Sequence, residues 1–264
     1  MRVYFCLLAA VVIFADACGA GSPPTSRPLG VFNVVDSSNG AGGYVVKPTG
    51  VFWSASNLTL PYSGNVPDSC VDTVYFPPVV DTATLTNQLD AGPQVSFQTD
   101  LGTGVMTPDT IPGKLISYQY HGPGVPHTPG ADIIFTIPGA AGGVDAATQH
   151  MVTAKRLVLG PVDTAPADSL HLTWLIGQPG LAAVNIYLIY ATATSSILNR
   201  QIFCQLYDDG DQYLNVFISK KWKNAAQTQQ KVTAFRYVTT YTTGSNNLLL
   251  LSISKFDTLR APLP

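Results

Sequence analysis

Three aspartates around one glycine form a compact acidic cluster: Asp208, Asp209 and Asp211, on either side of Gly210. Carboxylates gathered on a tight turn can ligate Ca²⁺ through their oxygens. The spacing lacks the regular D-x-D-x-D-G order of a calcium loop and its distal glutamate. A solvent-exposed hairpin turn is therefore the favoured interpretation, and a calcium site is the alternative.

A second candidate metal site is the histidine pair in the segment HGPGVPH, which runs from His121 to His127. The prolines restrict the backbone of this loop, so the two imidazoles could meet on a transition metal. Asp132, His150 or His171 would have to supply a third ligand. The usual C-x-x-C and H-E-x-x-H spacings do not occur here, which favours polar surface histidines.

Catalytic motifs are harder to find. The chain contains no G-x-S-x-G nucleophile elbow. Its 16 acidic residues allow a glycosidase pair, but no spacing places two carboxylates opposite each other. We therefore predict a non-enzymatic protein that needs no cofactor. The net charge of −2 gives no electrostatic basis for binding nucleic acid or an anionic membrane surface.

Strands must position these residues, because apolar side chains alternate along four consecutive segments: Leu170–Trp174, Val184–Tyr190, Ile202–Tyr207 and Leu214–Ile218. A period of two places one face of each strand in a core. Gly, Pro, Ser and Asp residues separate the segments, as in sandwiches and barrels. We predict an all-β fold, an antiparallel β-sandwich with two packed immunoglobulin-like lobes, and four consecutive antiparallel strands at its centre.

On the face opposite this core, the alternation places Tyr187, Phe203 and Tyr207 together. Exposed aromatic rings on a flat sheet would form a platform for stacking on sugars or for contact with a protein. The alternative is a second covered face, buried by a neighbouring lobe. We favour that alternative because these strands are apolar on both sides.

The remaining strands and the lobe boundary follow from the same pattern. A proline-rich segment, Pro161–Asp168, interrupts the alternation, so we expect one lobe over residues 29–163 and a second over residues 164–264. Lys220–Lys223 is predicted to be a basic surface turn around Trp222. Further strands are expected at Lys114–Tyr120, Ile133–Ile137, Val152–Leu159, Lys231–Thr240 and Leu248–Ile253.

The first 17 residues have the features of a secretory signal peptide: a basic Arg2, a short apolar run over Val3–Phe14 and the cleavage-site pattern Ala15-Asp16-Ala17. Cys18 follows this site directly, as the acylated cysteine of a bacterial lipoprotein does. Residues 18–28 are rich in Gly, Ser and Pro and would form a flexible tether. Cleavage by an ordinary signal peptidase, with Cys18 left unmodified, is the alternative.

Two cysteines remain after Cys6 leaves with the signal peptide and Cys18 is assigned to the lipid: Cys70 and Cys204. In an exported protein such a pair indicates a disulfide. Cys204 shares a strand face with Ile202 and Leu206, so it points into the core. The alternative is a buried Cys204 thiol and a free Cys70.

Several short segments carry a resemblance: Cys18, Asp68-Ser69-Cys70, Leu89–Pro93, Ile137–Asp145, Leu170–Trp174, and Phe203-Cys204 followed by Asp208–Asp211. In this order the chain resembles uncharacterised exported lipoproteins of environmental Gram-negative bacteria, of myxobacterial and acidobacterial type, with β-sandwich domains. The resemblance covers most of the mature chain and implies a location and a fold.

We therefore expect a non-enzymatic protein of the cell envelope, anchored at the outer membrane or the cell surface by a lipid on Cys18. Its role would be structural or would consist of contacts with other proteins. The alternative function is binding of a carbohydrate or another small ligand by a β-sandwich module. The expected partners are the membrane, through the lipid, and a protein or a glycan, but not nucleic acid.

Overall fold

The computed structural model describes residues 27–55, 66–75, 88–111, 114–162, 169–192, 194–195, 197–225, 230–243 and 248–260. The predicted signal peptide, Cys18 and most of the predicted tether lie outside these residues. The first strand begins at Arg27, so the last two residues of the predicted tether, Arg27 and Pro28, belong to a strand.

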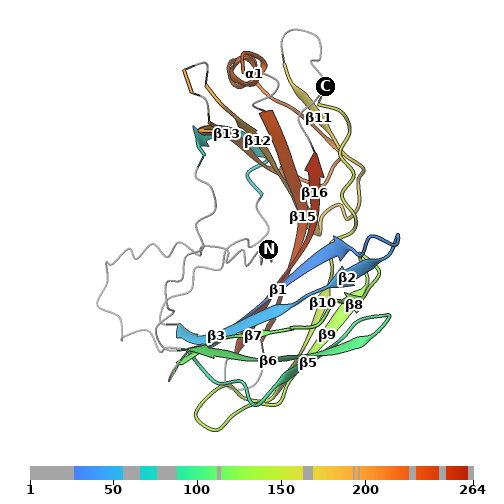
Figure 1. The fold of residues 1–264 in the computed structure, drawn as a ribbon, viewed down its shortest axis with the longest axis vertical. Coiled ribbons are helices and arrows are strands. Elements are labelled where there is room, and N and C mark those ends of the chain that lie inside the picture. The colour runs from blue at the N-terminus through green and yellow to red at the C-terminus, as the bar shows by residue number, and fades with distance from the viewer. Residues whose placement is uncertain are drawn as a thin grey trace, which may run out of the picture.

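The described chain folds almost entirely into strands, as the sequence predicts (Figure 1). The strands before residue 160 are β1 (Arg27–Ser38), β2 (Tyr44–Val46), β3 (Thr49–Ala55), β4 (Ser69–Val74), β5 (Val95–Gln98), β6 (Thr103–Ile111), β7 (Lys114–Gln119), β8 (Val125–Pro126), β9 (Asp132–Ile137) and β10 (Ala147–Val152). The later elements are β11 (His171–Thr173), β12 (Ala182–Tyr190), β13 (Arg200–Tyr207), β14 (Asp211–Tyr213), α1 (Val216–Lys223), β15 (Gln230–Thr243) and β16 (Leu249–Arg260).

One large sheet has the strand order β10-β9-β5-β6-β7-β3-β1-β16-β15-β12-β13-β4, and β2 and β8 branch from β1. A small second sheet consists of β11 and β14. The all-β, sandwich-like fold class is confirmed. The large sheet is mixed, because β1 pairs in parallel with β16 while the other pairs are antiparallel.

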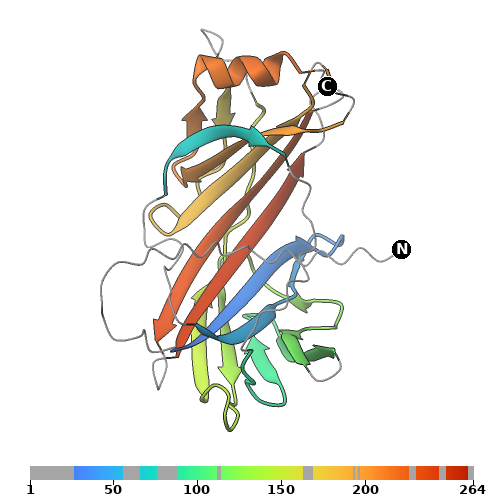
Figure 2. The same cartoon turned by 90° about the vertical axis from the view of Figure 1, so that its left-hand side faces the viewer.

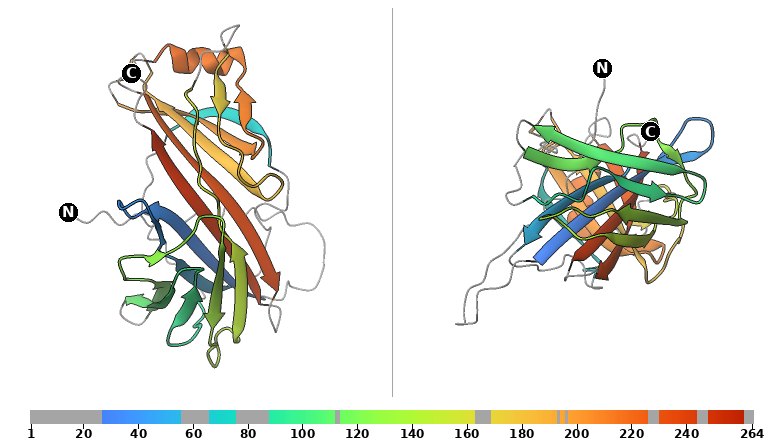
Figure 3. Two further views of the ribbon diagram at one scale, coloured as in Figure 1. Left: turned by 90° about the vertical axis from the view of Figure 1, so that its right-hand side faces the viewer. Right: turned by 90° about the horizontal axis from the view of Figure 1, so that it is seen from below.

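Two hydrophobic cores lie in the two lobes of the molecule (Figure 1 and Figure 3). The N-terminal core includes Phe32, Phe52 and Phe135, whose rings pack within 6 Å of one another in the pairs Phe32–Phe52 (5.6 Å) and Phe32–Phe135 (4.1 Å). The C-terminal core includes the inward side chains of β12 and β13 together with Trp174 and Trp222. Strands supply most of each core, and helix α1 and the segment after β10 contribute to the C-terminal one.

The long strands β15 and β16 run from one lobe into the other (Figure 2). Val232 and Ala234 of β15 pack in the C-terminal core, whereas Leu248 and Leu250 at the start of β16 pack in the N-terminal core. Strands from the two halves of the sequence also pair with each other, β1 with β16 and β4 with β13. The two lobes therefore share one continuous sheet, and residues 163–168 of the predicted boundary lie outside the described chain.

Close packing around β1 requires a glycine at position 30. Phe32 and Val34 alternate into the N-terminal core, while Asn33 and Val35 face the other side. Gly30 lies beneath the Phe52 ring, and a Cβ at this position would come within 2.6 Å of the ring and 2.7 Å of Leu250. A side chain at residue 30 would therefore force β1 away from β3 and β16.

Two of the strand predictions for the central region are correct and two need correction. β12 and β13 form the expected hairpin, with Ile186 opposite Cys204. The segment Leu170–Trp174 contains β11, but it pairs with β14 rather than with β12. The predicted fourth strand, Leu214–Ile218, is wrong: β14 ends at Tyr213, and helix α1 begins at Val216.

Helix α1 forms because Asn215 caps it and because its apolar residues recur at helical spacing. The Asn215 side chain accepts a hydrogen bond from the Ile218 amide at 2.9 Å. Ile218 and Trp222, four residues apart, both pack in the C-terminal core. The predicted basic surface turn around Trp222 is therefore wrong, because Trp222 is 3 % exposed and packs in the C-terminal core.

The predicted strand at Val152–Leu159 is also misplaced. β10 covers Ala147–Val152 and ends where that prediction begins. Leu157 and Leu159 are buried without belonging to a strand, and Leu159 forms a single bridge with Trp174. The apolar residues of Val152–Leu159 therefore reflect burial in the core and not strand pairing.

Candidate functional site

The face of the sheet that points away from the C-terminal core carries a row of aromatic rings. Register places Tyr187 of β12 directly opposite Phe203 of β13, and their ring centroids lie 4.9 Å apart at an interplanar angle of 27°. Phe235 of β15 continues the row, 5.9 Å from Tyr187. All three side chains are partly exposed. We call this surface the outer face.

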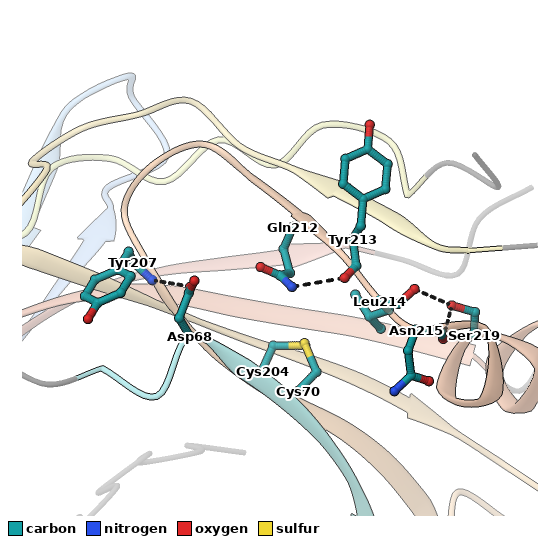
Figure 4. Close-up of a disulfide and its surroundings, with 9 residues drawn as sticks. All are labelled: Asp68, Cys70, Cys204, Tyr207, Gln212, Tyr213, Leu214, Asn215 and Ser219. Atoms are coloured by element: carbon teal, nitrogen blue, oxygen red, sulfur yellow. Dashed lines mark hydrogen bonds between the residues drawn. A yellow bond between two sulfur atoms is a disulfide. The ribbon is translucent and has the colours of Figure 1, made fainter. Parts of the chain in front are cut away.

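Tyr207 lies on the same side of β13 but away from this row. It is opposite Ala183, four residues along the strand from Phe203, a separation of about 13 Å. Its side chain is 42 % exposed, and its backbone amide donates to Asp68 Oδ1 at 3.2 Å (Figure 4). The structure therefore brings together two of the three predicted platform residues, Tyr187 and Phe203, and adds Phe235.

Polar groups accompany the rings. Asn185 and Gln205 are opposite each other on β12 and β13, next to the Tyr187–Phe203 pair. Gln205 Nε2 donates to the hydroxyl of Tyr237 at 2.8 Å. Lys255 Nζ lies 5.2 Å from the centre of the Phe235 ring, within range of a cation–π interaction. The residues that carry these polar groups, Asn185, Gln205, Tyr237 and Lys255, are all buried, whereas the three rings are partly exposed. The rings are therefore the accessible part of the outer face.

The disulfide predicted between Cys70 and Cys204 is present, with a sulfur–sulfur distance of 2.03 Å (Figure 4). The two cysteines are directly opposite each other on β4 and β13. Cys204 is fully buried in the C-terminal core, as its strand face predicts. The bond joins residues 134 positions apart in the sequence and fixes β4 to the edge of the sheet.

The acidic cluster does not form a calcium site around Asp208. This carboxylate is buried, and Arg236 Nη2 lies 2.8 Å from its Oδ1. It also accepts hydrogen bonds from the Trp174 indole at 3.1 Å and from the amides of Gly177 and Gln178 at 3.1 and 2.6 Å. A guanidinium and three N–H donors therefore occupy the oxygens that a cation would need.

The other two members of the cluster, Asp209 and Asp211, are exposed. Asp211 Oδ2 lies 3.3 Å from His171 Nε2, and the His171 ring stacks on Tyr213 at 4.1 Å. Gly210 has a φ of 105°, which the tight turn requires and which glycine adopts without strain. In the described part of the chain, no three His, Cys, Asp or Glu side chains gather closely enough to hold a metal ion.

Of the two loop histidines, His121 is exposed and His127 is buried. The ring nitrogens of His127 are occupied: Nδ1 lies 2.9 Å from Asp100 Oδ1, and Nε2 lies 2.8 Å from Thr153 Oγ1. Burial lowers the pKa of His127 below its usual value, although Asp100 acts in the opposite direction. His127 is therefore a packed core histidine rather than a surface side chain.

The order Thr153–His127–Asp100 has the form of a catalytic triad but not the access that one needs. Thr153 is fully buried, and its hydroxyl also accepts from the Gly130 amide and donates to the Ala131 carbonyl, each at 2.9 Å. A substrate carbonyl could not reach this oxygen without opening the lobe. The three residues pin the 127–131 turn to the end of β10.

A third polar cluster, which the sequence did not reveal, surrounds Asp72 on β4. Arg200 Nη2 and Lys221 Nζ each lie 2.5 Å from Asp72 Oδ2, and the Tyr190 hydroxyl donates to Oδ1 at 2.9 Å. Burial acts to raise the pKa of Asp72, but the hydrogen bonds from these three residues hold it below its usual value. Burial and the bond to Asp72 raise the pKa of Tyr190 to about 12.

An open hollow on the N-terminal lobe is lined by Gln98, Thr99, Asp100, Ala131, Asp132 and Ile134. Although burial acts to raise it, hydrogen bonds from Thr128 hold the pKa of Asp100 below its usual value. A general acid needs a raised pKa, so Asp100 is unsuited to that role.

No family model, curated protein or solved structure matches this chain.

Proposed function

We propose that this chain is an exported, non-enzymatic protein of the cell envelope, held at a membrane by a lipid on Cys18, that contacts a partner protein through its outer face. The Cys70–Cys204 disulfide fits an oxidising compartment outside the cytoplasm. In the described residues no helix has the length and apolar character needed to cross a membrane.

The observation that carries the proposal is the aromatic row on the outer face. Tyr187, Phe203 and Phe235 stack across three neighbouring strands and remain partly exposed, although the opposite side of the same strands already supplies the C-terminal core. Aromatic side chains are the residues that protein interfaces favour most, because they bury a large area at little cost in conformational entropy. The rigid sheet holds them in place before a partner arrives.

The polar clusters support a role without catalysis. Each candidate catalytic group is engaged in holding the fold: Asp208 with Arg236, His127 with Asp100 and Thr153, and Asp72 with Arg200 and Lys221. A general acid or base must be able to exchange its proton with a substrate. The side chains of each of these clusters are instead hydrogen-bonded or ion-paired within the fold.

Binding of a carbohydrate is the second candidate, favoured by the composition of the same face. Sugars stack on aromatic rings, and the rings of Tyr187 and Phe203 lie side by side and are partly exposed. Both candidates use the same surface, and they differ in the partner.

Site-specific photo-crosslinking tests the protein-contact proposal. A photo-reactive aromatic residue in place of Phe203 is expected to yield a crosslinked product in intact cells. The matched control is the same residue in place of Leu101, which is 61 % exposed on the N-terminal lobe. Equal products at both positions, or none at residue 203, would overturn the proposal for the outer face.

A glycan array tests the second candidate with the purified protein. Binding to a glycan that Tyr187→Ala and Phe203→Ala both weaken, while Leu101→Ala leaves it unchanged, would favour carbohydrate as the partner. Circular dichroism of each variant must show an unchanged strand content, so that loss of binding is not loss of fold.

A further inference from the structure

Helix α1 presents an unusual surface at the far end of the C-terminal lobe. Phe217, Lys220 and Lys221 are three or four residues apart and so share one helical face. Phe217 is 82 % exposed, the largest exposed fraction among the described large apolar side chains. Lys220 and Lys221 are also exposed. This face carries one large aromatic ring beside two cations.

The other side of α1 is firmly attached to the lobe. Ser219 Oγ accepts a hydrogen bond from the Leu170 amide at 2.9 Å, and the Trp222 carbonyl accepts one from Gln230 Nε2 at 2.6 Å. The Trp222 ring packs edge-on against Tyr190 at 6.3 Å. The helix is therefore held with Phe217 directed outward, and the exposure of this ring does not come from a loose segment.

A second apolar side chain lies at the same end of the lobe. The turn between β12 and β13 exposes 70 % of Ile197. The shared ion pairs of Asp72 with Arg200, which begins β13, and with Lys221 of α1 place this turn and the helix beside each other. Figure 2 shows α1 lying across this end of the strands. We call the surface formed by Ile197, Phe217, Arg200, Lys220, Lys221 and Lys223 the α1 end.

The α1 end is basic, although the whole chain has a net charge of −2. Arg200, Lys220, Lys221 and Lys223 lie there, and register puts Lys231 opposite Ile189, next to them. The ion pairs place one acidic group at this end, Asp72, whose side chain is 7 % exposed and already paired with two cations. Positive charge is therefore in local excess.

Exposed cations beside exposed apolar side chains are the combination that binds the interface of an anionic bilayer. The ammonium groups are attracted by lipid phosphates, and aromatic and branched apolar side chains enter the boundary between headgroups and acyl chains. A soluble polyanion would engage the cations but not Phe217 and Ile197. A protein partner could cover both kinds of side chain, and a test with protein-free vesicles separates it from a bilayer.

We propose that the α1 end is a membrane-docking surface that binds anionic lipid bilayers through Arg200, Lys220 and Lys223 and inserts Phe217 and Ile197 at the headgroup level. This goes beyond the proposed function, because it does not require acylation of Cys18 and does not use the outer face. A chain tethered by its N-terminus would gain a fixed orientation from this second contact.

Vesicle flotation tests the proposal with the full chain carrying Cys18→Ser, which cannot be acylated. The probes are vesicles of phosphatidylcholine mixed with phosphatidylglycerol, and vesicles of phosphatidylcholine alone. The protein is expected to float with the anionic vesicles and to remain in solution with the neutral ones. Phe217→Ser is expected to lower partitioning about tenfold, and Lys220→Gln about fivefold.

The matched controls are Leu101→Ser and Lys47→Gln, an exposed apolar residue and an exposed lysine of the other lobe. Both should float like the parent chain. Equal flotation with neutral and anionic vesicles, or equal losses in the controls, would overturn the proposal. Loss with Lys220→Gln but none with Phe217→Ser would also overturn it, since it would indicate purely ionic contact, as with an acidic protein.

Discussion

Arg236 and Asp208 form a fully buried ion pair, with Arg236 Nη2 2.8 Å from Asp208 Oδ1 and neither side chain exposed to solvent. The guanidinium also donates to the carbonyls of Lys155, Arg156 and Leu175. It therefore joins β15 to the segment that follows β10 and to the loop after β11. The pair lies where the segment after β10, the loop after β11 and β15 meet.

Replacing Arg236 by an uncharged residue should lower the free energy of unfolding. Arg236→Met is expected to lower the free energy of unfolding by about 3–5 kcal/mol, because it leaves the Asp208 charge buried without its partner. Urea denaturation followed by fluorescence measures the change. Arg236→Met combined with Asp208→Asn should lose less than the sum of the single variants, and the exposed Arg156→Gln should lose little. A loss below about 1 kcal/mol for Arg236→Met would contradict this account of the pair.

A second buried polar contact holds the entry to β5. The Tyr118 hydroxyl lies 2.7 Å from Asp90 Oδ1 and accepts from the Ala91 amide at 2.9 Å. Tyr118→Phe removes the hydroxyl and leaves a buried amide without its acceptor, so we expect a loss of about 1–3 kcal/mol in unfolding free energy. Tyr213→Phe, at a tyrosine that is 56 % exposed, is the control and should change little. Equal changes in unfolding free energy for Tyr118→Phe and Tyr213→Phe would show that the hydrogen bonds of the Tyr118 hydroxyl do not stabilise the fold.

Acid should weaken the protein through Asp72. Its pKa is lower in the folded chain than in the unfolded one, so the folded state binds fewer protons between these two values. The stability contributed by Asp72 is complete above the unfolded pKa, about 3.9, and is lost as the pH falls through the lower, folded pKa. Asp72→Asn is expected to reduce the slope of unfolding free energy against pH in this acid range. An unchanged slope would show that other carboxylates govern the acid response.

The disulfide should contribute a large part of the stability of the C-terminal lobe. Closing a loop of 134 residues restricts the unfolded chain, and we expect Cys70→Ala with Cys204→Ala to cost roughly 3–5 kcal/mol. Thermal unfolding of the double variant, compared with the parent protein with and without reductant, measures this. A double variant that melts like the oxidised parent would exclude a stabilising role for the bond.

The sequence predicted elements whose side chains alternate between a core and an open face. β7, β9, β12, β13 and β15 form where this pattern predicts strands, and the inward position of Cys204 predicted its disulfide. β9 alternates in burial as expected, whereas β12 is buried on both faces except at Tyr187. The same rule failed at Leu214, Val216 and Ile218, which alternate by chance at the start of α1. The helical spacing of Ile218 and Trp222, four residues apart and followed by Ala225, was the signal for the helix.

Contacts between distant segments could not be predicted in this way. The parallel pairing of β1 with β16 joins residues about as far apart as the chain allows, for example Leu29 and Leu249. Asp208 was predicted to be exposed on a turn, because nothing local indicates that Arg236 will reach it. The same holds for Asp72, whose partners Tyr190 and Lys221 follow it by 118 and 149 residues. Local pattern specifies the strands but not the polar side chains that meet between them.

The tether on Cys18 is the central claim that remains to be measured, and it determines where the outer face and the α1 end operate. The most direct measurement is the intact mass of the mature protein purified from membrane and soluble fractions, before and after reduction. We predict a membrane-bound chain that begins at Cys18, carries added acyl chains, and gains the mass of one pair of hydrogens when Cys70–Cys204 is reduced. An unmodified chain in the soluble fraction would contradict the lipid anchor.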